Sequence, residues 1–501
     1  MNSTKVKLPI TDKPSIYSGI HYAYPCAIVE SDEIAILTVN QTDSKTWAVV
    51  NDDLDVVIDG NEIRLLKKNT SSNVRAFLWR KFEATDEVAL EVNDIKIHKK
   101  HVDLFLFSGD PEFQSNDVNE CGIRWSLPGY TIKGIQHDYD TYIFKYVKIH
   151  KEDDIVVFYG SSYGEEWVYL DETRLPEHLK NVELKVGLEV EFGVDRFNEW
   201  KYMNFIQLTY NDYNIYKGMT LDYYLYPRKY YDNSFSFFGI FLNTYYDLYH
   251  ECINLFPSIH DFLHWNIQNH YYVNLCLNEY YVPQRECYQK KYHEHYNLFF
   301  GFDDEKRVYY VLGYGSVSKP VVSEIPYEIL DNENIVVNEY VVRFKYEPDC
   351  ISEIEFNINP VIRQIEEYVN SVDSSQVTCN LIPGEKLKYG ISVLKYMADN
   401  EEECGDVCRD LRITYMLNER HEIMSQRLEY LFNNHFLKEN EFWELCNMNS
   451  ELRKASTNLM YTAIKGKLKK VDSKVFSDQL MEMYEKDKEF CNMLIHNLRM
   501  Y

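Results

Sequence analysis

The alternation of hydrophobic and polar positions divides the chain into three regions with different periods. Up to about residue 212 the hydrophobic positions form short β-branched or aromatic runs, among them "EIAILTV", "DIVVFYGSS" and "LKVGLEVEFG", with turn residues between them. Short strands separated by turns at regular intervals are typical of antiparallel sandwiches. The pattern therefore predicts an N-terminal antiparallel β-sandwich over residues 1–212.

Residues 213–350 combine a helical period with a strand period. Apolar positions three and four residues apart predict a helix from Phe237 to Leu255, and "HYYVNLCLNEYYVP" alternates as a strand does. In "HYNLFFGFDDEKRVYYVLGY" two apolar and aromatic runs flank the polar turn Asp303–Lys306, which predicts an antiparallel hairpin. A helix packed on a small antiparallel sheet is an α+β domain.

Residues 351–501 carry the helical period throughout. In "CRDLRITYMLNERHEIMSQRLEYLFNNH" the positions Ile413, Leu417, Met424 and Leu428 trace one apolar stripe, with Glu and Arg opposite. We expect a helical domain that packs as a bundle or docks a partner. The predicted fold class is thus multidomain α+β, with an N-terminal antiparallel β-sandwich, a central α+β domain and a C-terminal helical region.

Charge and composition exclude some classes of binding partner. The 501 residues include 53 Lys and Arg against 79 Asp and Glu, and a formal net charge of -26 disfavours a surface that follows nucleic-acid phosphates or anionic lipids. No stretch of about 18 apolar residues is present to span a membrane. We therefore expect no nucleic-acid partner and no membrane association.

The cysteines and the N-terminal segment indicate the cellular compartment in which we expect the protein. The 11 cysteines are scattered without a CxxC pair, and "MNSTKVKLPITDK" lacks the apolar core of a secretory signal. This combination favours reduced thiols in a cytoplasmic protein. His293 and His295 point to one face of a strand, but two ligands two residues apart are a small set, so we expect no metal and no cofactor.

The stretch from Asp154 to Gly193 resembles the end of the concanavalin-like jelly-roll family. There a strand, a turn of the S-x-D-G-x-x-W type and a strand with V-G-L follow one another, as "DIVVFYGSSYGEEWVYL" and "VELKVGLEVEFG" do here. Gly164 and Trp167 fit the turn, whereas Tyr163 stands where the family has Asp. The resemblance implies a glycan-binding module or a protein-docking scaffold, because the fold alone does not decide between them.

Three tryptophans are candidate binding residues of this region. Trp125, Trp167 and Trp200 offer aromatic faces on which a sugar ring can stack, and core or rim packing is the alternative use of the same side chains. A glycan thus stands beside a protein as the expected partner of the sandwich.

His295 opens the first strand of the central hairpin. Papain-like folds place a cysteine nucleophile at the N-terminus of a long helix, where the helix dipole stabilises the thiolate, and a histidine at the head of a strand across the cleft. His295, Gly301 and Asp303, with "NEYYVP" before them, resemble the papain-like N-terminal domain of butirosin biosynthesis protein H. The match spans residues 221–345 and is similar, more distantly, to bacteriocin-processing peptidases.

The resemblance implies a papain-like acyltransferase domain in which His295 is the catalytic base. Ser236 aligns with the cysteine nucleophile of the family, and Gly313 occupies the place where the orienting acid is expected. Both positions depart from the family pattern. The implied substrate is an acyl or peptidyl group, presented free or by a carrier or synthetase protein.

Three functions remain open on these residues. The first is an accessory protein of bacterial peptide natural-product biosynthesis that binds or transfers an acyl or peptidyl group, with a degenerate site or with Ser236 and His295 acting as a pair. The second is a non-catalytic scaffold that binds a glycan or a protein. The third is an active hydrolase or transferase that uses one of the cysteines.

Overall fold

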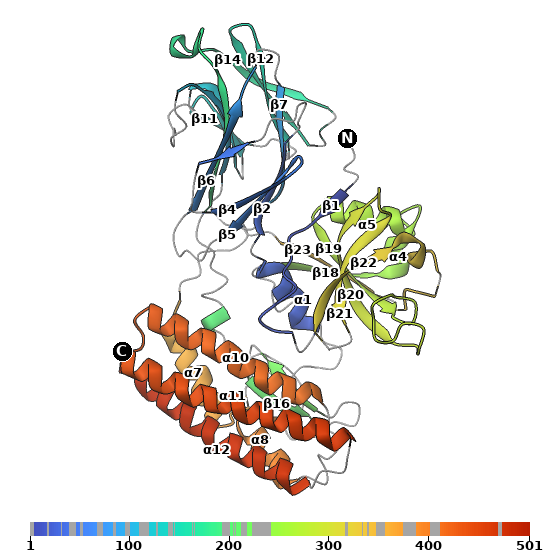
Figure 1. Cartoon of the computed structure of the whole chain (residues 1–501), viewed down its shortest axis with the longest axis vertical. Coiled ribbons are helices and arrows are strands. Elements are labelled where there is room, and N and C mark those ends of the chain that lie inside the picture. Colours follow the sequence, from blue (N-terminus) through green and yellow to red (C-terminus); the bar gives the residue numbers. More distant parts are fainter. Residues whose placement is uncertain are drawn as a thin grey trace. The chain divides into compact units, whose positions relative to one another are not determined.

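The computed structural model has mixed α and β structure with several antiparallel sheets (Figure 1). It describes residues 5–17, 20–31, 33–39, 47–50, 54–67, 74–83, 87–95, 101–109, 120–126, 129–138, 144, 146–162, 164, 166–192, 201–203, 205, 207–211, 218–222, 242–315, 319–332, 334–337, 340–346, 356–373, 387–400, 411–468 and 473–500.

Contacts within the chain divide it into two compact units, each built from separate stretches. The first is Met1–Pro14, Tyr24–Asp195 and Phe238–Ser352, and the second is Ser15–Ala23, Arg196–Phe237 and Glu353–Tyr501. The boundary expected at residue 212 therefore lies inside a stretch of the second unit. The boundary expected at residue 350 lies close to a unit boundary.

Two antiparallel sheets form the part of the first unit between residues 33 and 192. One has the order β11 (Ile135–Asp138), β10 (Gly129–Ile132), β9 (Gly122–Ser126), β8 (His101–Phe107), β15 (Lys185–Phe192), β6 (Val74–Lys81) and β3 (Ala48–Val49). The other has the order β14 (Val168–Arg174), β13 (Ile155–Ser161), β12 (Tyr146–Glu152), β7 (Glu87–Ile95), β2 (Glu33–Val39), β5 (Glu62–Lys67) and β4 (Leu54–Asp59). Residues of both sheets, such as Leu37 and Leu104, are buried in one shared core, which makes the pair a sandwich.

The glycine of the V-G-L strand β15 has a packing reason. A Cβ at Gly187 would lie 2.7 Å from the ring of Phe105. That ring is stacked on Phe77 with centroids 5.9 Å apart, in a small buried aromatic cluster. The missing side chain lets the two rings pack over the strand.

The first unit also contains a separate central sheet. Its order is β18 (Leu242–Leu248), β23 (Tyr340–Tyr346), β19 (Tyr271–Asn278), β20 (Glu294–Asp303), β21 (Val308–Tyr314) and β22 (Pro320–Pro326), and β1 (Lys5–Lys7) also pairs with β20. The hairpin of β20 and β21 is the one that the sequence predicts. Helix α5 (Ile259–Gln268) lies beside this sheet (Figure 1) and buries Phe262, Leu263 and Ile267. Ser258 caps the helix by accepting a hydrogen bond from its first turn.

The N-terminal residues belong to the central sheet and not to the sandwich. β1 pairs with the end of β20, and beyond it the Leu8 N–H donates to the Phe300 carbonyl at 2.7 Å. Helix α1 (Ile20–Val29) precedes the sandwich strand β2. The expectation that residues 1–212 form one sandwich is therefore corrected at its N-terminal end, where the sandwich begins only at β2.

The helix expected from Phe237 to Leu255 is wrong for residues 242–248 and correct for residues 249–253. Residues 242–248 form β18, which pairs with β23 along its whole length, and only the short helix α4 (Tyr249–Ile253) follows. The segment "LNTYYDL" is rich in Tyr and Thr, which suit strands. Its hydrogen bonds to β23 decide the structure, and the local pattern contains no information about that partner.

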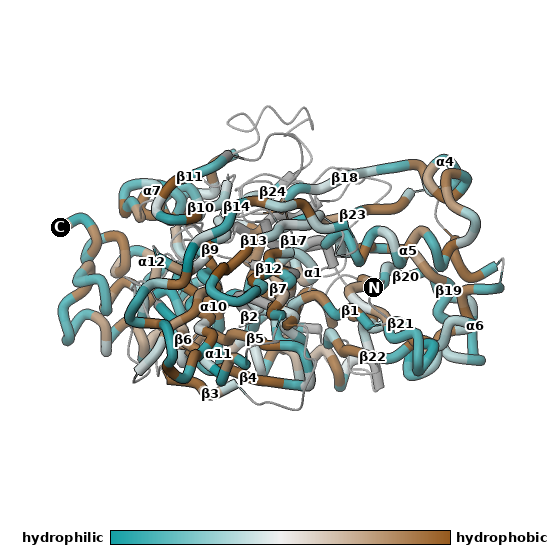
Figure 2. Tube along the Cα trace, turned by 90° about the horizontal axis from the view of Figure 1, so that it is seen from above, coloured by the Kyte–Doolittle hydropathy of each residue, from teal (hydrophilic) through white to brown (hydrophobic). Residues whose placement is uncertain are grey.

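The second unit is mainly helical. Its elements are α7 (Ile358–Val369), α8 (Ser392–Asp399), α10 (Leu411–Asn433), α11 (Glu439–Leu468) and α12 (Ser473–Leu498), with a small sheet of β17 (Gly218–Asp222), β16 (Gln207–Asn211) and β24 (Leu387–Tyr389). The stripe expected on α10 is confirmed, since Ile413, Leu417, Met424 and Leu428 are buried. Hydrophilic and hydrophobic residues alternate around these helices (Figure 2). None of the described helices combines the length and the apolar character needed to cross a membrane.

Candidate functional site

His295 lies near the head of β20, opposite Leu277 of β19. Its Nδ1 is 3.1 Å from the Tyr296 carbonyl oxygen, and that oxygen also accepts a hydrogen bond from the Tyr24 hydroxyl of α1 at 2.6 Å. A carbonyl oxygen can only accept, so Nδ1 must carry the imidazole proton. The neutral ring consequently presents its lone pair at Nε2, which is the tautomer that a general base requires.

The surroundings of His295 are aromatic and half-buried. The ring of His293 is stacked on it at a centroid distance of 5.8 Å, and Tyr314 meets it edge-on at 5.3 Å. His293 precedes β20 and so is not on the strand itself, but its ring does lie beside that of His295, as the sequence analysis expects. Burial lowers the pKa of His295 to about 4, and the neighbouring His293 acts in the same direction.

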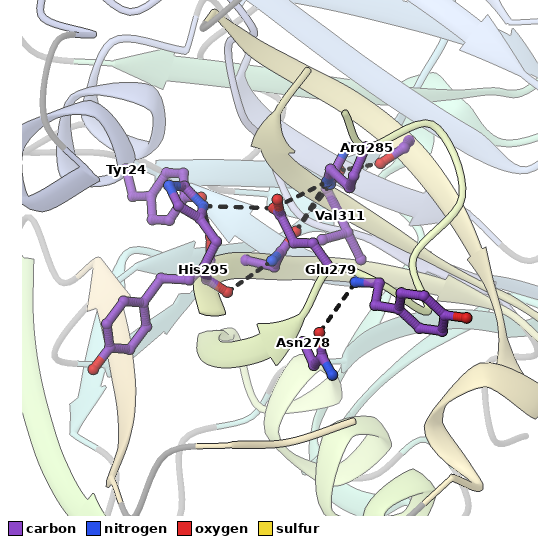
Figure 3. Close-up of polar contacts among 10 residues, drawn as sticks. Tyr24, Asn278, Glu279, Arg285, His295 and Val311 are labelled. Atoms are coloured by element: carbon purple, nitrogen blue, oxygen red, sulfur yellow. Dashed lines mark hydrogen bonds and ion pairs between the residues drawn. The ribbon is translucent and has the colours of Figure 1, made fainter. Parts of the chain in front are cut away.

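A buried carboxyl that the sequence analysis missed lies beside this ring. Glu279 directly follows β19, and its Oε1 is 3.6 Å from His295 Nδ1 and 3.7 Å from Arg285 Nε. Figure 3 shows the carboxyl between the two. Burial raises the pKa of Glu279 to about 7, although Arg285 and a hydrogen bond with Asn297 oppose the shift. At neutral pH the contact therefore joins a neutral imidazole and a carboxyl close to its midpoint, and is not a full ion pair.

Gly313 leaves room for a buried pair of polar side chains. A Cβ at this position of β21 would come within 2.3 Å of Arg285 Nη2 and 2.5 Å of Asn297 Oδ1. Arg285 Nη2 donates to Asn297 Oδ1 at 2.9 Å, and Asn297 Nδ2 donates to the His295 carbonyl at 3.0 Å. The site expected to hold an orienting acid is thus filled by two side chains from elsewhere, which fix the backbone at His295.

The other two residues of the motif have structural roles. A Cβ at Gly301 would lie 2.6 Å from the Val6 carbonyl oxygen, so glycine permits β1 to approach β20. Asp303 Oδ1 accepts from the Lys306 N–H at 3.0 Å and so closes the hairpin turn. The side chain of His295, in contrast, contacts the Tyr296 carbonyl and the ring of His293, and not the turn or β1.

The candidate nucleophiles do not form a catalytic pair with His295 in the described part of the chain. Ser236 lies outside the described residues, and the helix on which its assignment depended is replaced from residue 242 by β18. Burial raises the pKa of Cys276 to about 12 and that of Cys252 above its usual value. Both thiols therefore stay protonated at neutral pH and are poor nucleophiles.

The three tryptophans differ in their exposure. Trp125 is 5% exposed, belongs to the sandwich core and donates its Nε1–H to the Phe144 carbonyl at 2.6 Å, so it offers no open face to a sugar. Trp167 is partly exposed, with Lys148 Nζ 4.4 Å from the ring centroid. Trp200 lies outside the described residues. Gly164, which precedes Trp167 by three residues, has φ of +77° and donates its N–H to Ser161 Oγ at 2.9 Å.

The connection from β19 to β20 also brings metal-binding types of side chain together. Glu279, Cys287 and His293 each place one ligand atom within 4.8 Å of the others. The sequence analysis considered the histidine pair alone. The cysteine and the glutamate were overlooked because their spacing fits no common metal motif.

Comparison with known proteins adds little. No protein-family model matches the chain, and no curated protein matches it. One solved structure, a functionally unknown protein from Saccharomyces cerevisiae, aligns with 30% of this chain and 92% of its own at 11% identity and a TM-score of 0.14. A similarity at that level carries no argument about fold or function.

Proposed function

We propose that the central domain is a papain-like module that binds an acyl or peptidyl group and in which His295 serves as the base for its transfer. The protein would act as an accessory protein of bacterial peptide natural-product biosynthesis in the cytoplasm. One observation carries the proposal: the hydrogen bond from Nδ1 to the Tyr296 carbonyl holds His295 in the tautomer with Nε2 unprotonated.

The chemistry assigned to His295 is proton transfer at Nε2. As an amine or hydroxyl attacks the acyl carbon, Nε2 takes its proton, and the imidazolium then returns that proton to the leaving thiolate or alkoxide. The transient positive charge forms 3.6 Å from the Glu279 carboxyl, which favours it. Glu279 thus takes the place in the proposal that the family pattern gives to an acid on the return strand.

The nucleophile has two possible origins in this proposal. Either Ser236 attacks the acyl group after giving its proton to His295, or the acceptor molecule attacks directly while the domain holds the donor. Neither route uses Cys276 or Cys252, because their thiols are protonated.

Acyl transfer by the full-length protein tests the proposal. The protein is incubated with acyl thioesters of a small thiol and, separately, with a serine-directed fluorophosphonate, and adducts are located by mass spectrometry. We expect His295→Ala to slow transfer by about 100- to 10,000-fold, because a general base contributes about that much. His250→Ala, on the exposed surface of α4, is the matched control and should leave the rate unchanged.

The outcomes also separate the two routes. Fluorophosphonate labelling of Ser236 that is lost in His295→Ala identifies the serine route, and transfer without labelling identifies direct attack. Transfer that is insensitive to His295→Ala would contradict the assignment of the base. Failure of any acyl thioester to bind would contradict the module itself.

A concanavalin-like glycan-binding sandwich is the second candidate function, and Trp167 is the observation that favours it. Its ring is partly exposed, and Tyr169 on the following strand is 54% exposed. Titration of tryptophan fluorescence with a panel of glycans should give a response that Trp167→Ala abolishes. The absence of any response would leave protein docking as the function of the sandwich.

A further inference from the structure

The segment between β19 and β20 folds back so that its two ends meet. The Glu279 N–H donates to the His293 carbonyl at 2.8 Å, and the Gln289 N–H donates to the Tyr280 carbonyl at 2.9 Å. Asn278 Oδ1 accepts from the Tyr280 N–H at 3.2 Å (Figure 3). Backbone hydrogen bonds, and not chance side-chain positions, therefore bring the ends of this connection together.

Three different ligand types converge at this closed connection. Glu279 supplies a carboxylate, Cys287 a thiol and His293 an imidazole, with their ligand atoms within 4.8 Å of one another. Glu279 and Cys287 are 4% and 5% exposed, whereas His293 is exposed. Thiolate, imidazole and carboxylate are the three protein ligands of Zn²⁺.

A second feature indicates that a ligand is needed here. Glu279 Oε1 is buried and has no hydrogen-bond partner among the described residues. The nearest cationic group, Arg285 Nε at 3.7 Å, lies beyond hydrogen-bond distance and donates to Asn297 instead. A buried carboxylate oxygen without a donor is costly, and a bound cation would satisfy it.

We propose that Glu279, Cys287 and His293 bind one Zn²⁺ ion, with the fourth position open to water or another small ligand. One thiolate and one carboxylate balance the two charges of the ion, so the site adds no net charge beside Arg285. The soft thiolate selects zinc over Mg²⁺ or Ca²⁺. Zn–S and Zn–N bonds of about 2.3 and 2.0 Å need ligand atoms about 3.3–3.8 Å apart, so ligand atoms at the 4.8 Å limit would have to approach by about 1 Å when the ion binds.

His295 is not one of the three clustered ligand residues. Its Nδ1 is committed to the Tyr296 carbonyl. The metal site shares Glu279 with the proposed base, but His295 is not a ligand, so variants of Cys287 and His293 test the metal site and His295→Ala tests the base. A zinc ion would fix the connection directly beside the base.

Titration with Co²⁺ in place of Zn²⁺ tests the proposal on the full-length, chelator-treated protein. We expect one equivalent to bind with a thiolate-to-cobalt charge-transfer band and the strong visible bands of four-coordinate cobalt, and Zn²⁺ should displace it. Cys287→Ser should abolish the charge-transfer band. His293→Ala and Glu279→Gln should each weaken binding by at least about 100-fold, beyond the loss typical of an outer-shell partner.

The controls use residues of the same types outside the cluster. Cys276→Ser replaces a buried cysteine of the neighbouring strand β19, His250→Ala replaces an exposed histidine, and His295→Ala removes the adjacent ring; all three should keep the band. A missing band, a band that survives Cys287→Ser, or a band lost in His295→Ala would overturn the proposed ligand set. Glu279→Gln and His293→Ala decide the question if Cys287→Ser does not fold.

Discussion

Asp487 in the helical unit and Glu279 beside His295 are both carboxylates withdrawn from water, and their partners differ. Asp487 accepts from Arg420 Nη1 at 2.6 Å and from the Tyr368 hydroxyl. Burial alone would raise its pKa, yet Arg420 and the hydrogen bonds hold the pKa below the usual value. Glu279 has one buried oxygen without a partner, and burial raises its pKa to about 7.

The difference separates a structural carboxylate from a candidate site. A fully paired buried ion stabilises one packing arrangement and has no capacity left for a ligand. A buried oxygen without a donor marks a place where a ligand or a moving proton can complete the arrangement. Asp487 fits the first description and Glu279 the second, so we place the candidate site at the connection after β19 and assign the Arg420–Asp487 pair to the framework of the helical unit.

Asp487→Asn should have the largest effect on stability. It leaves Arg420, which is 1% exposed, without its counter-charge, and an uncompensated buried charge costs about 3–5 kcal/mol. Denaturant unfolding of the full-length chain, followed by the helical signal in circular dichroism, measures this loss. The control Glu451→Gln removes an exposed ion pair with Lys454 and should change the free energy of unfolding by less than about 1 kcal/mol. Equal effects of the two variants would contradict a framework role.

The substitutions Gly390→Ala and Gly313→Ala compare how much stability each region loses when a methyl group is added at a closely packed glycine. At Gly390 the backbone has φ of +56° and a Cβ would lie 2.2 Å from the Tyr368 carbonyl oxygen, so we expect a loss of about 2–4 kcal/mol. At Gly313 the nearest atom is the end of the Arg285 side chain, which can move, so the loss should be about 1–2 kcal/mol. Thermal or denaturant unfolding gives both values. A larger loss at Gly313 would show that the Arg285–Asn297 pair is as rigid as backbone.

His421 should make the helical unit sensitive to acid. Burial lowers its pKa to about 4, and Arg420 acts in the same direction. The unfolded chain therefore binds a proton at this histidine near pH 6.5, whereas the folded chain binds it only near pH 4. Stability therefore falls as the pH falls through this interval, by about 2 kcal/mol between pH 7 and pH 5. Unfolding of His421→Gln at the two pH values should show a smaller difference than unfolding of the unchanged protein. The same pH dependence in both would assign it to other groups.

Elements whose cause is local could be predicted from the sequence. The hairpin around Asp303 follows from turn residues between two apolar runs, and β2 coincides with the predicted strand "EIAILTV". The buried stripe of α10 follows from its period. In each case the residues that determine the structure are neighbours in the chain.

What could not be predicted depends on partners far along the chain. The segment "LNTYYDL" forms the strand β18 because it pairs with β23, and β1 belongs to the central sheet because it pairs with β20. In the site, His295 was found from its motif, but Glu279 and Arg285 were not, because a connection with no repeating pattern brings them to the ring. A search for acids on the return strand alone could not find a carboxyl that precedes the histidine.

The pairing of β1 with β20 has a consequence for synthesis on the ribosome. Lys7 and its partner Gly301 leave the ribosome about 15–60 s apart at about 5–20 residues per second, and the whole sandwich is made between them. The strands of the sandwich can therefore pair with one another before β20, the partner of β1, has been synthesised. The histidine region is therefore assembled late, from the beginning of the chain and a segment that emerges about 300 residues after it.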